Sequence, residues 1–237
     1  MSLSSAVSRL TEYLRRHGFA ATVRRAGLAA RRSIFAGRMV VFYCDLDERK
    51  LRPISIPKTF SIKRVNALTE LGTERLQEMT SFWNPKLASR NIRERFEKGA
   101  SLWLVECEGR LAGYGWTLQG QAIERYYFPL TSGDAQLFDF YVFPSFRGRA
   151  LHWLLTGHIL HMLALEGASR AFADTGEWNA AQLASFKMTP LRRFGQVRTY
   201  KIFGQQLTRW DADEPEGQVQ RRPARGNKAI KVLRPNE

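Results

Sequence analysis

The sequence predicts a mixed α/β domain in which helices flank a central sheet. Three observations predict this class. Residues 137–143 (LFDFYVF) are apolar on both faces, which is typical of a strand covered on both sides. Residues 151–165 form the clearest helical segment of the chain. Two short apolar runs, SLWLVEC and RLAGYGW, are joined by Glu108-Gly109, which predicts a β-hairpin.

The remaining elements divide the chain into three parts. A basic, helical N-terminal arm with a short buried strand at 39–46 occupies residues 1–50, and a polar, flexible tail occupies residues 211–237. The main domain is expected over residues 55–210. Within it we expect strands at 61–65, 170–174 and 197–203, helices over 68–96 (broken at Asn84-Pro85) and 179–188, and an aromatic loop at 121–134.

The composition is that of a globular protein with a high positive charge. The 237 residues are 44% hydrophobic, and 37 Lys and Arg against 22 Asp and Glu give a net charge of +15. This charge favours anionic partners, namely nucleic acid, acidic lipid or phosphorylated cofactors and substrates, without choosing among them. Cys44 and Cys107 lie in apolar runs, so we expect buried free thiols and a reducing, cytoplasmic compartment. No apolar run is long enough to span a membrane.

The first 37 residues are rich in arginine, and Glu12 is their only acid. Leu3, Val7, Leu10 and Leu14 recur at helical spacing. Such an arm fits a helix on an anionic membrane surface, a nucleic-acid contact or an organellar transit peptide. We favour a solvated helical arm packed on the domain, with peripheral contact to the inner face of a membrane as the second interpretation. Nucleic acid is disfavoured because no nucleic-acid-binding motif is present.

The most informative stretch joins the central strand to the helix that follows it. Pro144 ends the strand, and the first helical turn leaves backbone N–H groups without intrahelical partners. Gly148 and Ala150 remove side-chain bulk, so an anion can approach these amides closely. Arg147 and Arg149 add two cations. This junction therefore predicts a cradle for a pyrophosphate group.

The junction resembles the coenzyme A loop of the GNAT superfamily of N-acetyltransferases. The superfamily has Val-x-Pro and then Gln/Arg-x-x-Gly-x-Gly/Ala, and here the chain reads Val142-x-Pro144-x-x-Arg147-Gly148-x-Ala150-Leu151. The resemblance covers roughly residues 55–210 and implies an α/β (α+β) fold with a mixed, mostly antiparallel central sheet flanked by helices. It implies that pantetheine contacts the backbone around Tyr141 and Val142. The pyrophosphate would bind the amides of Arg147, Gly148, Arg149, Ala150 and Leu151.

A second stretch resembles the part of the superfamily that lines the far side of the cofactor. Asn179 follows a predicted strand and Ser185 lies on the ensuing helix, so the resemblance assigns both to the pantetheine arm and the phosphates. Phe186 stands where the superfamily often has the tyrosine that reprotonates the leaving thiolate, and a phenyl ring cannot donate a proton. The other departures are Ser145 for Gln or Arg, His152 for a small residue, and Pro190-Leu191 for Gly-Phe, with Phe194-Gly195 soon after.

The reaction that the resemblance implies is the direct attack of an amine on a thioester. The amine must lose a proton, so a carboxylate or an ordered water must act as base. Asp139 is the first candidate because it shares a strand face with Tyr141. Glu124 and Asp174 are weaker candidates because both also fit ordinary charged positions in a loop or at a strand end. A backbone N–H of the central strand would stabilise the oxyanion.

These observations predict an acyl-CoA-dependent N-acyltransferase with acetyl-CoA, or another acyl-CoA, as co-substrate. The predicted acceptor is an amine of a small molecule or sugar, and residues 126–128 with the GYGW segment are expected to line its pocket. The alternative is a non-catalytic, degenerate GNAT-fold module whose basic arm binds a membrane surface or nucleic acid. We expect no metal, because His158 and His161 have no evident third ligand.

Overall fold

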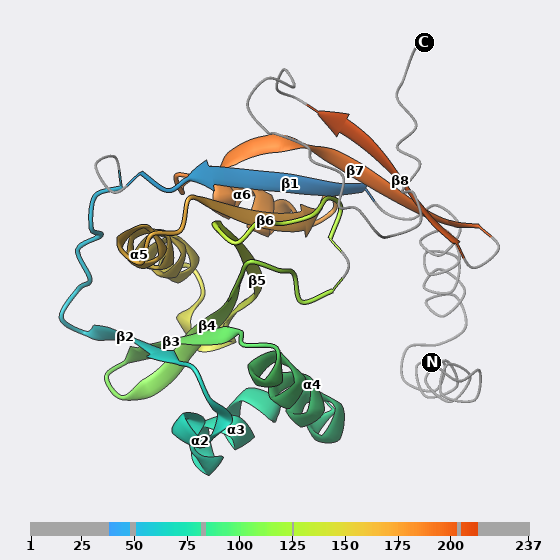
Figure 1. The fold of residues 1–237 in the computed structure, drawn as a ribbon. Coiled ribbons are helices and arrows are strands. Elements are labelled where there is room, and N and C mark those ends of the chain that lie inside the picture. The colour runs from blue at the N-terminus through green and yellow to red at the C-terminus, as the bar shows by residue number, and fades with distance from the viewer. Residues whose placement is uncertain (1–37, 48–50, 82–83, 125, 203–204, 213–237) are drawn as a thin grey trace, which may run out of the picture.

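The computed structural model describes residues 38–47, 51–81, 84–124, 126–202 and 205–212 (Figure 1). Its strands are β1 (Arg38–Asp45), β2 (Phe60–Val65), β3 (Ser101–Cys107), β4 (Arg110–Gln119), β5 (Asp134–Val142), β6 (Arg170–Gly176), β7 (Arg192–Ile202) and β8 (Gln205–Ala212). Its helices are α2 (Leu68–Leu71), α3 (Thr73–Thr80), α4 (Pro85–Glu97), the short 3-10 helix η1 (Pro144–Phe146), α5 (Leu151–Leu165) and α6 (Ala180–Phe186). The predicted helical arm and residues 213–237 of the predicted tail lie outside the described residues.

The described strands form one mixed sheet in the order β2-β3-β4-β5-β6-β1-β7-β8. Neighbouring strands are antiparallel except for β5 and β6, which are parallel. Helices lie on both sides of this sheet (Figure 1). The predicted fold class, a mostly antiparallel central sheet flanked by helices, is therefore confirmed.

β1 lies inside the sheet, although it comes first among the described elements. Val41 pairs with Asp174 of β6 on one edge and with Gly195 of β7 on the other. Because this strand is covered on both faces, its apolar residues form a continuous run instead of alternating with polar ones. The sequence analysis assigns the strand to the N-terminal arm and begins the domain at residue 55. In the structure the strand is part of the domain's sheet.

The other elements lie close to their predicted positions, with three differences. The helical stretch has a second break at Gly72, where φ is 73°. β5 begins at Asp134, inside the predicted loop, because its first residues pair with β6. β7 begins at Arg192, five residues before the predicted strand, because its early part pairs with β1.

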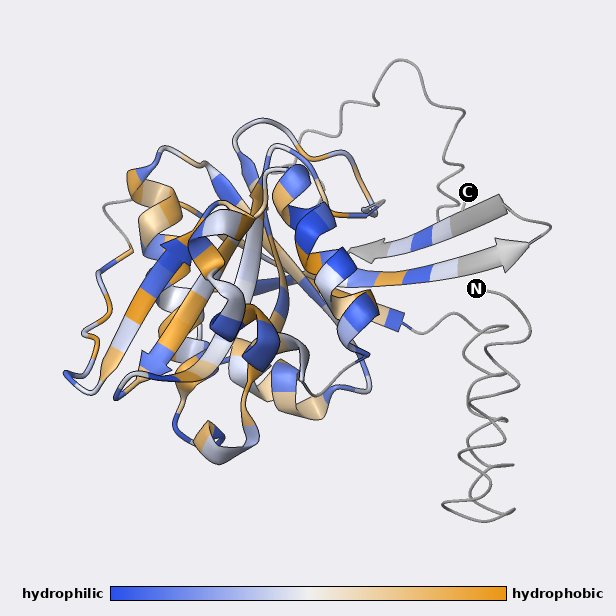
Figure 2. Ribbon diagram, turned by 90° about the horizontal axis from the view of Figure 1, so that it is seen from below, coloured by the Kyte–Doolittle hydropathy of each residue, from blue (hydrophilic) through white to orange (hydrophobic). Residues whose placement is uncertain are grey.

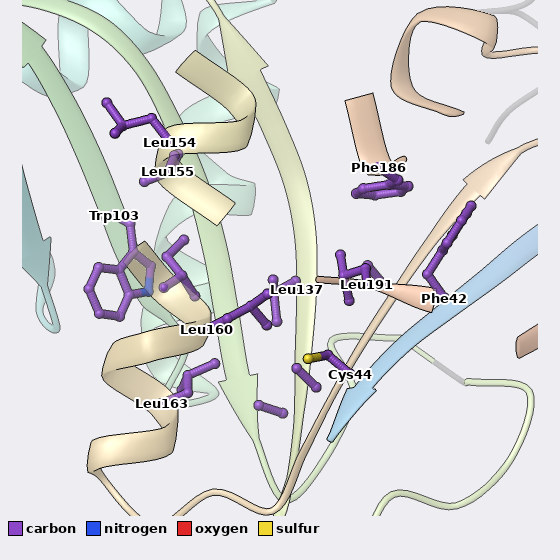
Figure 3. Packing of buried hydrophobic residues seen from close by; sticks show 14 of the residues in the cluster. Phe42, Cys44, Trp103, Leu137, Leu154, Leu155, Leu160, Leu163, Phe186 and Leu191 are labelled. Atoms are coloured by element: carbon purple, nitrogen blue, oxygen red, sulfur yellow. The ribbon is translucent and has the colours of Figure 1, made fainter. Parts of the chain in front are cut away.

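The main hydrophobic core surrounds α5 (Figures 1 and 3). This helix lies in the angle between β1 and β6 on one side and β2 to β4 on the other (Figure 1). Trp103 of β3 and Phe186 of α6 belong to the same core. A Cβ atom on Gly157 of α5 would lie 1.9 Å from Cδ1 of Ile54. The absent side chain therefore lets the β1–β2 connection pack directly on the helix.

Two smaller cores cover the opposite face of the sheet. Helices α2 to α4 bury one cluster against β3, β4 and β5, with Trp116 at its centre. The loop before β5 buries the other against β1, β6 and β7, where Phe128 contacts Phe172 and Phe194. Figure 2 shows that β7 and β8 extend as a pair beyond the body of the domain.

The two cysteines are free and buried, as predicted. Burial is the main cause that raises the pKa of the Cys44 thiol to about 11, so this thiol is protonated at neutral pH. Among the described residues, no helix is long and apolar enough to cross a membrane.

Candidate functional site

The central feature of the site is the place where β5 and β6 separate. Their parallel pairing begins at Asp134–Arg170 and ends only three residues later at Leu137–Ala173. Beyond this point β5 continues along β4, while β6 continues along β1. Beyond Leu137 and Ala173, the facing edges of β5 and β6 therefore do not pair with each other.

The closed end of this separation is held by a buried ion pair. Asp134 is 1% exposed, and its carboxylate accepts hydrogen bonds from Nε and Nη2 of Arg170 at 2.7 and 3.0 Å. The backbone N–H and the hydroxyl of Thr131 also donate to Oδ2 of Asp134, at 2.7 and 2.8 Å. These bonds keep the first residues of β5 and β6 together, so the strands part at a defined residue.

A β-bulge bends β5 as it leaves β6. Tyr114 faces Tyr141 and Trp116 faces Phe138, so Gly115 alone faces two residues of β5. One of the two, Asp139, has φ of 49°, a value in the left-handed region that few non-glycine residues adopt. A Cβ atom on Gly115 would lie 2.6 Å from the ring of Phe140. Glycine is therefore required for Phe140 to pack against β4 at the bulge.

Asp139, the first predicted base, forms an ion pair across the bulge. Its Oδ2 accepts a hydrogen bond from Nη1 of Arg95 on α4. The Arg95 guanidinium also lies 5.2 Å from the ring centroid of Trp116 and 5.5 Å from that of Phe138. Arg95 cannot be recognised as a site residue from the sequence, because only the tertiary structure brings α4 next to the bulge.

The predicted anion cradle forms an irregular turn before α5. Gly148 has φ of 78°, and a Cβ atom there would meet nothing within 4 Å. Ala150, the residue before the first helical turn, has φ of 56°. Arg147 and Arg149 are both exposed, whereas Leu151 is buried. Open space at Gly148 therefore lies beside two exposed cations, as an anion site requires. The predicted contact through the Arg147 amide is not available, because this N–H already donates to the carbonyl of Pro144 at 3.3 Å.

The free edge of β5 carries one of the two predicted pantetheine contacts. The N–H of Phe143 bonds to the carbonyl of Ala112 on β4, so the neighbouring carbonyl of Val142 points to the other edge. That carbonyl accepts a hydrogen bond from Nε of Arg147 at 3.2 Å. Tyr141 differs: its carbonyl lies toward Gly113 of β4, so its backbone faces away from the separation.

His152 lies between α5 and α6 beside the separated strands. Its Nδ1 is 2.8 Å from the hydroxyl oxygen of Ser185, and its ring contacts the rings of Phe140 and Phe186. The other ring nitrogen, Nε2, is buried without a hydrogen-bond partner. Burial lowers the pKa of His152 to about 4, so the ring is neutral at pH 7.

Asn179 is used as a helix cap. Its side-chain oxygen accepts a hydrogen bond from the backbone N–H of Gln182 at 3.2 Å, and its amide nitrogen donates to Oε1 of Gln182 at 3.0 Å. The same Gln182 oxygen accepts a bond from the hydroxyl of Thr175 on β6 at 3.1 Å. Asn179 therefore positions α6 over β6, and its polar atoms already have partners.

A second carboxylate lies on the opposite face of the sheet. Tyr127 donates its hydroxyl hydrogen to Oδ2 of Asp174 at 2.9 Å. Tyr126 lies next to Tyr127, with the ring centroids 4.9 Å apart, and its hydroxyl is buried without a partner. Burial is the main cause that raises the pKa of Asp174, and the negative charge of Glu124 adds to the effect.

The structure thus distributes the predicted site residues over several separate contacts. The cradle and the edge of β5 bring together Val142, Arg147, Gly148, Arg149, Ala150 and Leu151. Ser185 joins His152 at the α5–α6 interface, whereas Asn179 caps α6. Of the predicted bases, Asp139 pairs with Arg95 and Glu124 lies near Asp174. No group of metal-ligating side chains is found among the described residues.

The sequence comparison identifies the family to which this chain belongs. A model of the Acetyltransferase (GNAT) family matches residues 68–188, more than half of the 237 residues. The chain is therefore a member of the GNAT acetyltransferase family. This family uses acetyl-CoA as co-substrate. No curated protein matches the sequence.

Comparison with solved structures finds GNAT proteins that are similar to this chain at low identity. A tandem GNAT protein from the clavulanic acid biosynthesis pathway is similar with a TM-score of 0.52 at 16% identity, covering 73% of this chain and 56% of that one. A putative GNAT acetyltransferase from Novosphingobium aromaticivorans gives 0.47 at 15% identity, covering 68% and 61%. A GNAT acetyltransferase from Colwellia psychrerythraea gives 0.49 at 14% identity, covering 67% and 53%. The chain therefore spans little more than half the length of these proteins.

The residues present fit a nucleotide thiol carrier in two respects. The open turn at Gly148, flanked by two exposed arginines at the start of α5, suits a pyrophosphate because cations and a helix N-terminus both attract anions. The unpartnered Nε2 of His152 suits the polar amides of a pantetheine arm, since a buried polar atom is stabilised by a hydrogen-bond partner. Both features lie beside the strand separation.

Proposed function

We propose that this protein is an acyl-CoA-dependent N-acyltransferase that transfers an acyl group, acetyl in the simplest case, to an amine of a small molecule or sugar. The observation that carries the proposal is the turn between β5 and α5. Its open glycine at position 148 and its exposed arginines lie beside a strand edge with an outward-facing carbonyl. Membership of the GNAT family supports the same conclusion.

An acyl-CoA supplies, when bound, an acyl group activated as a thioester. Arg147, Arg149 and the amides of residues 148–151 hold the pyrophosphate, because their positive charge and the helix N-terminus both attract anions. Arg147 also donates a hydrogen bond to the carbonyl of Val142, and the second lone pair of that oxygen can accept a bond from a pantetheine amide. The edge of β5 then orients the arm along the separation.

The chain's residues also define how the chemical step proceeds. In this proposal, a backbone N–H on the free edge of β5 stabilises negative charge that develops on the thioester oxygen. A carboxylate takes the proton of the attacking amine, and the sequence offers Asp139, Glu124 and Asp174 as candidates for this role. Phe186 has no proton to donate to the leaving sulfur. A thiol with a pKa of about 8.5 leaves as thiolate without a dedicated acid.

Calorimetry with acetyl-CoA tests the proposal through a matched pair of variants. Gly148 and Gly167 have the same local geometry. Their φ angles are 78° and 82°, and no atom lies within 4 Å of the position that a Cβ atom would take at either residue. Gly167 lies beyond the C-terminal end of α5, away from the cradle. We expect Gly148→Asp to weaken acetyl-CoA binding at least about tenfold, because juxtaposed like charges cost several kcal/mol. Gly167→Asp should bind as the wild type does.

Equal affinities of the two variants would contradict the cradle. If the folded wild-type protein does not bind acetyl-CoA at millimolar concentration, the acyltransferase proposal fails altogether. The alternative of a non-catalytic module would then apply. It predicts salt-dependent binding to anionic vesicles or nucleic acid without release of free thiol.

A further inference from the structure

β6 has one partly exposed residue at the point where it leaves β5. Ala173 is the last residue of β6 that pairs with β5, and Asp174 is the next. Residues 171–173 and 175–176 are buried, whereas Asp174 is half-buried. Its backbone is held in the sheet through its pairing with Val41 of β1. The carboxylate of Asp174 therefore lies on a strand that the sheet holds in place, one residue beyond the last residue pair of β5 and β6.

Asp174 points to the sheet face opposite α5. Side chains alternate along a strand, and Ala173 lies in the core around α5 while Phe172 lies in the cluster on the other face. Asp174 therefore shares the face of Phe172. The hydrogen bond from Tyr127 agrees, because Tyr127 packs against that same cluster. An acyl carrier held by α5 and an acceptor near Asp174 would thus approach the separation from opposite faces.

The surroundings of Asp174 favour a carboxylate that can accept a proton. Burial raises its pKa, the nearby charge of Glu124 raises it further, and the hydrogen bond from Tyr127 lowers it. Tyr126 also interacts with this carboxylate electrostatically. No salt bridge within the described part of the chain involves Asp174 or Glu124. A base whose pKa lies closer to the working pH transfers protons more effectively than a fully stabilised carboxylate.

Asp139, in contrast, is committed to a structural contact. Arg95 bonds to one of its carboxylate oxygens, and the same guanidinium covers the rings of Trp116 and Phe138. This ion pair ties Asp139 to α4 and holds the bulge at which Asp139 sits. Asp139 therefore serves to fix the course of β5, where the strand turns away from β6.

We propose that Asp174 is the general base of the transferase and that, together with Glu124, it forms the binding site for an acceptor that carries a cationic primary amine. Tyr127 is a positioning residue that orients the carboxylate. The inference rests on the proposed function, because it assigns the acceptor side of the same reaction. Two carboxylates without a cationic partner among the described residues are notable in a chain of net charge +15, and an ammonium group would complement them.

The bound ammonium releases one proton to solvent, and the neutral nitrogen attacks the thioester carbon with its lone pair to form the C–N bond. The C–S bond breaks, and its electron pair leaves with sulfur. The second nitrogen proton passes to the carboxylate of Asp174 and from there to the thiolate or to solvent. The products are an amide and a free thiol, and the enzyme returns to its starting protonation state.

The test measures release of free thiol from acetyl-CoA with three probe amines: a polyamine, an amino sugar and an aromatic ethylamine. The full chain is compared with Asp174→Asn, Asp139→Asn and, as a matched control, Asp45→Asn, which replaces an exposed carboxylate of β1. We expect Asp174→Asn to lower kcat/KM about 100-fold or more, the usual contribution of a general base, and to remove the acidic limb of its pH profile. Asp45→Asn should leave both unchanged.

The variant Tyr127→Phe tests whether Tyr127 orients the carboxylate of Asp174 or only supports the fold. Its hydrogen bond lowers the pKa of Asp174, so its loss should shift the acidic limb of kcat/KM to higher pH while thiol release continues. Calorimetry with acetyl-CoA on the same variants should show unchanged affinity, which separates a failure of the base from a failure of the proposed function.

If none of the three amines is acetylated, the rate of acetyl-CoA hydrolysis is measured for the same variants. Water is then the nucleophile, and the base must accept its proton. The inference is overturned by equal rates for Asp174→Asn and wild type. It is also overturned by a loss confined to Asp139→Asn, or by acetyl-CoA binding without any enzyme-dependent thiol release. Absence of acetyl-CoA binding overturns the proposed function instead.

Discussion

His152 is the residue at which this chain departs most informatively from the family pattern. A small residue is expected at this position of the loop, and the imidazole that replaces it fills the space between α5 and α6. Ser185 bonds to one ring nitrogen, and the other has no partner. The ring is kept neutral because it is buried beside the rings of Phe140 and Phe186.

This burial predicts an acid-sensitive contribution to stability. The folded-state pKa of His152, about 4, lies below its ordinary value of 6.5, so the unfolded chain binds a proton that the folded protein does not. The contribution is complete above pH 6.5 and is lost progressively as the pH falls toward 4. It amounts to roughly 3 kcal/mol at 1.36 kcal/mol per pKa unit.

Urea unfolding of the wild type and of His152→Gln between pH 7.5 and 4 measures this effect. Glutamine does not titrate, so the free energy of unfolding should fall more steeply with acid in the wild type than in the variant. Parallel curves for the two proteins would show that the imidazole is accessible to protons in the folded state.

At the scale of elements, β5 is the strand on which the site depends. It pairs with β6 only at its start, bends at a bulge, and follows β4 to the loop that precedes α5. The bend requires that Gly115 of β4 carry no side chain, because the ring of Phe140 occupies that space. The separation of β5 from β6 is thus built into the packing of the strand.

Gly115→Ala tests this packing. The added Cβ would meet the Phe140 ring at 2.6 Å, so we expect the variant to lose about 1–3 kcal/mol of unfolding free energy, as overpacked sites do. In a Phe140→Leu background the same substitution should cost less, because the end of the ring is gone. Chemical denaturation of the four proteins gives the coupling energy. Additive effects would mean that the ring yields freely.

At the scale of the whole molecule, β1 joins the two parts of the sheet. It pairs with both β6 and β7, and its side chains enter the core around α5 on one face and the aromatic cluster on the other. The matched part of the family model begins at residue 68, well after this strand. The domain therefore depends on a segment that lies outside the region of family similarity.

We expect a chain truncated to residues 55–212 not to fold, whereas one spanning residues 38–212 should unfold cooperatively. Loss of β1 exposes the edges of β6 and β7 and removes Val41, Phe42 and Tyr43 from the core. Each such side chain contributes about 1.5–3 kcal/mol, and whole domains are stable by only about 5–15 kcal/mol. Near-ultraviolet circular dichroism and thermal unfolding distinguish the two. A cooperative transition in the shorter chain would show that β1 is dispensable.

Local patterns determined much of this protein. The apolar run of β5, the clear helix of α5 and the hairpin of β3 and β4 are visible in the sequence because burial on both faces, helical periodicity and a glycine turn are properties of neighbouring residues. The cradle is visible for the same reason, since Pro144, Gly148 and Ala150 lie within seven residues.

Tertiary structure alone decided which distant groups meet. The pairing of Arg95 with Asp139, the contact of His152 with Ser185 and the bond from Tyr127 to Asp174 each join residues more than thirty positions apart. The place of β1 in the middle of the sheet is of the same kind. Hydrophobic patterning indicates which faces of an element are buried, but it does not indicate which element covers them. Pairing between strands depends on the whole set of strands that compete for each edge.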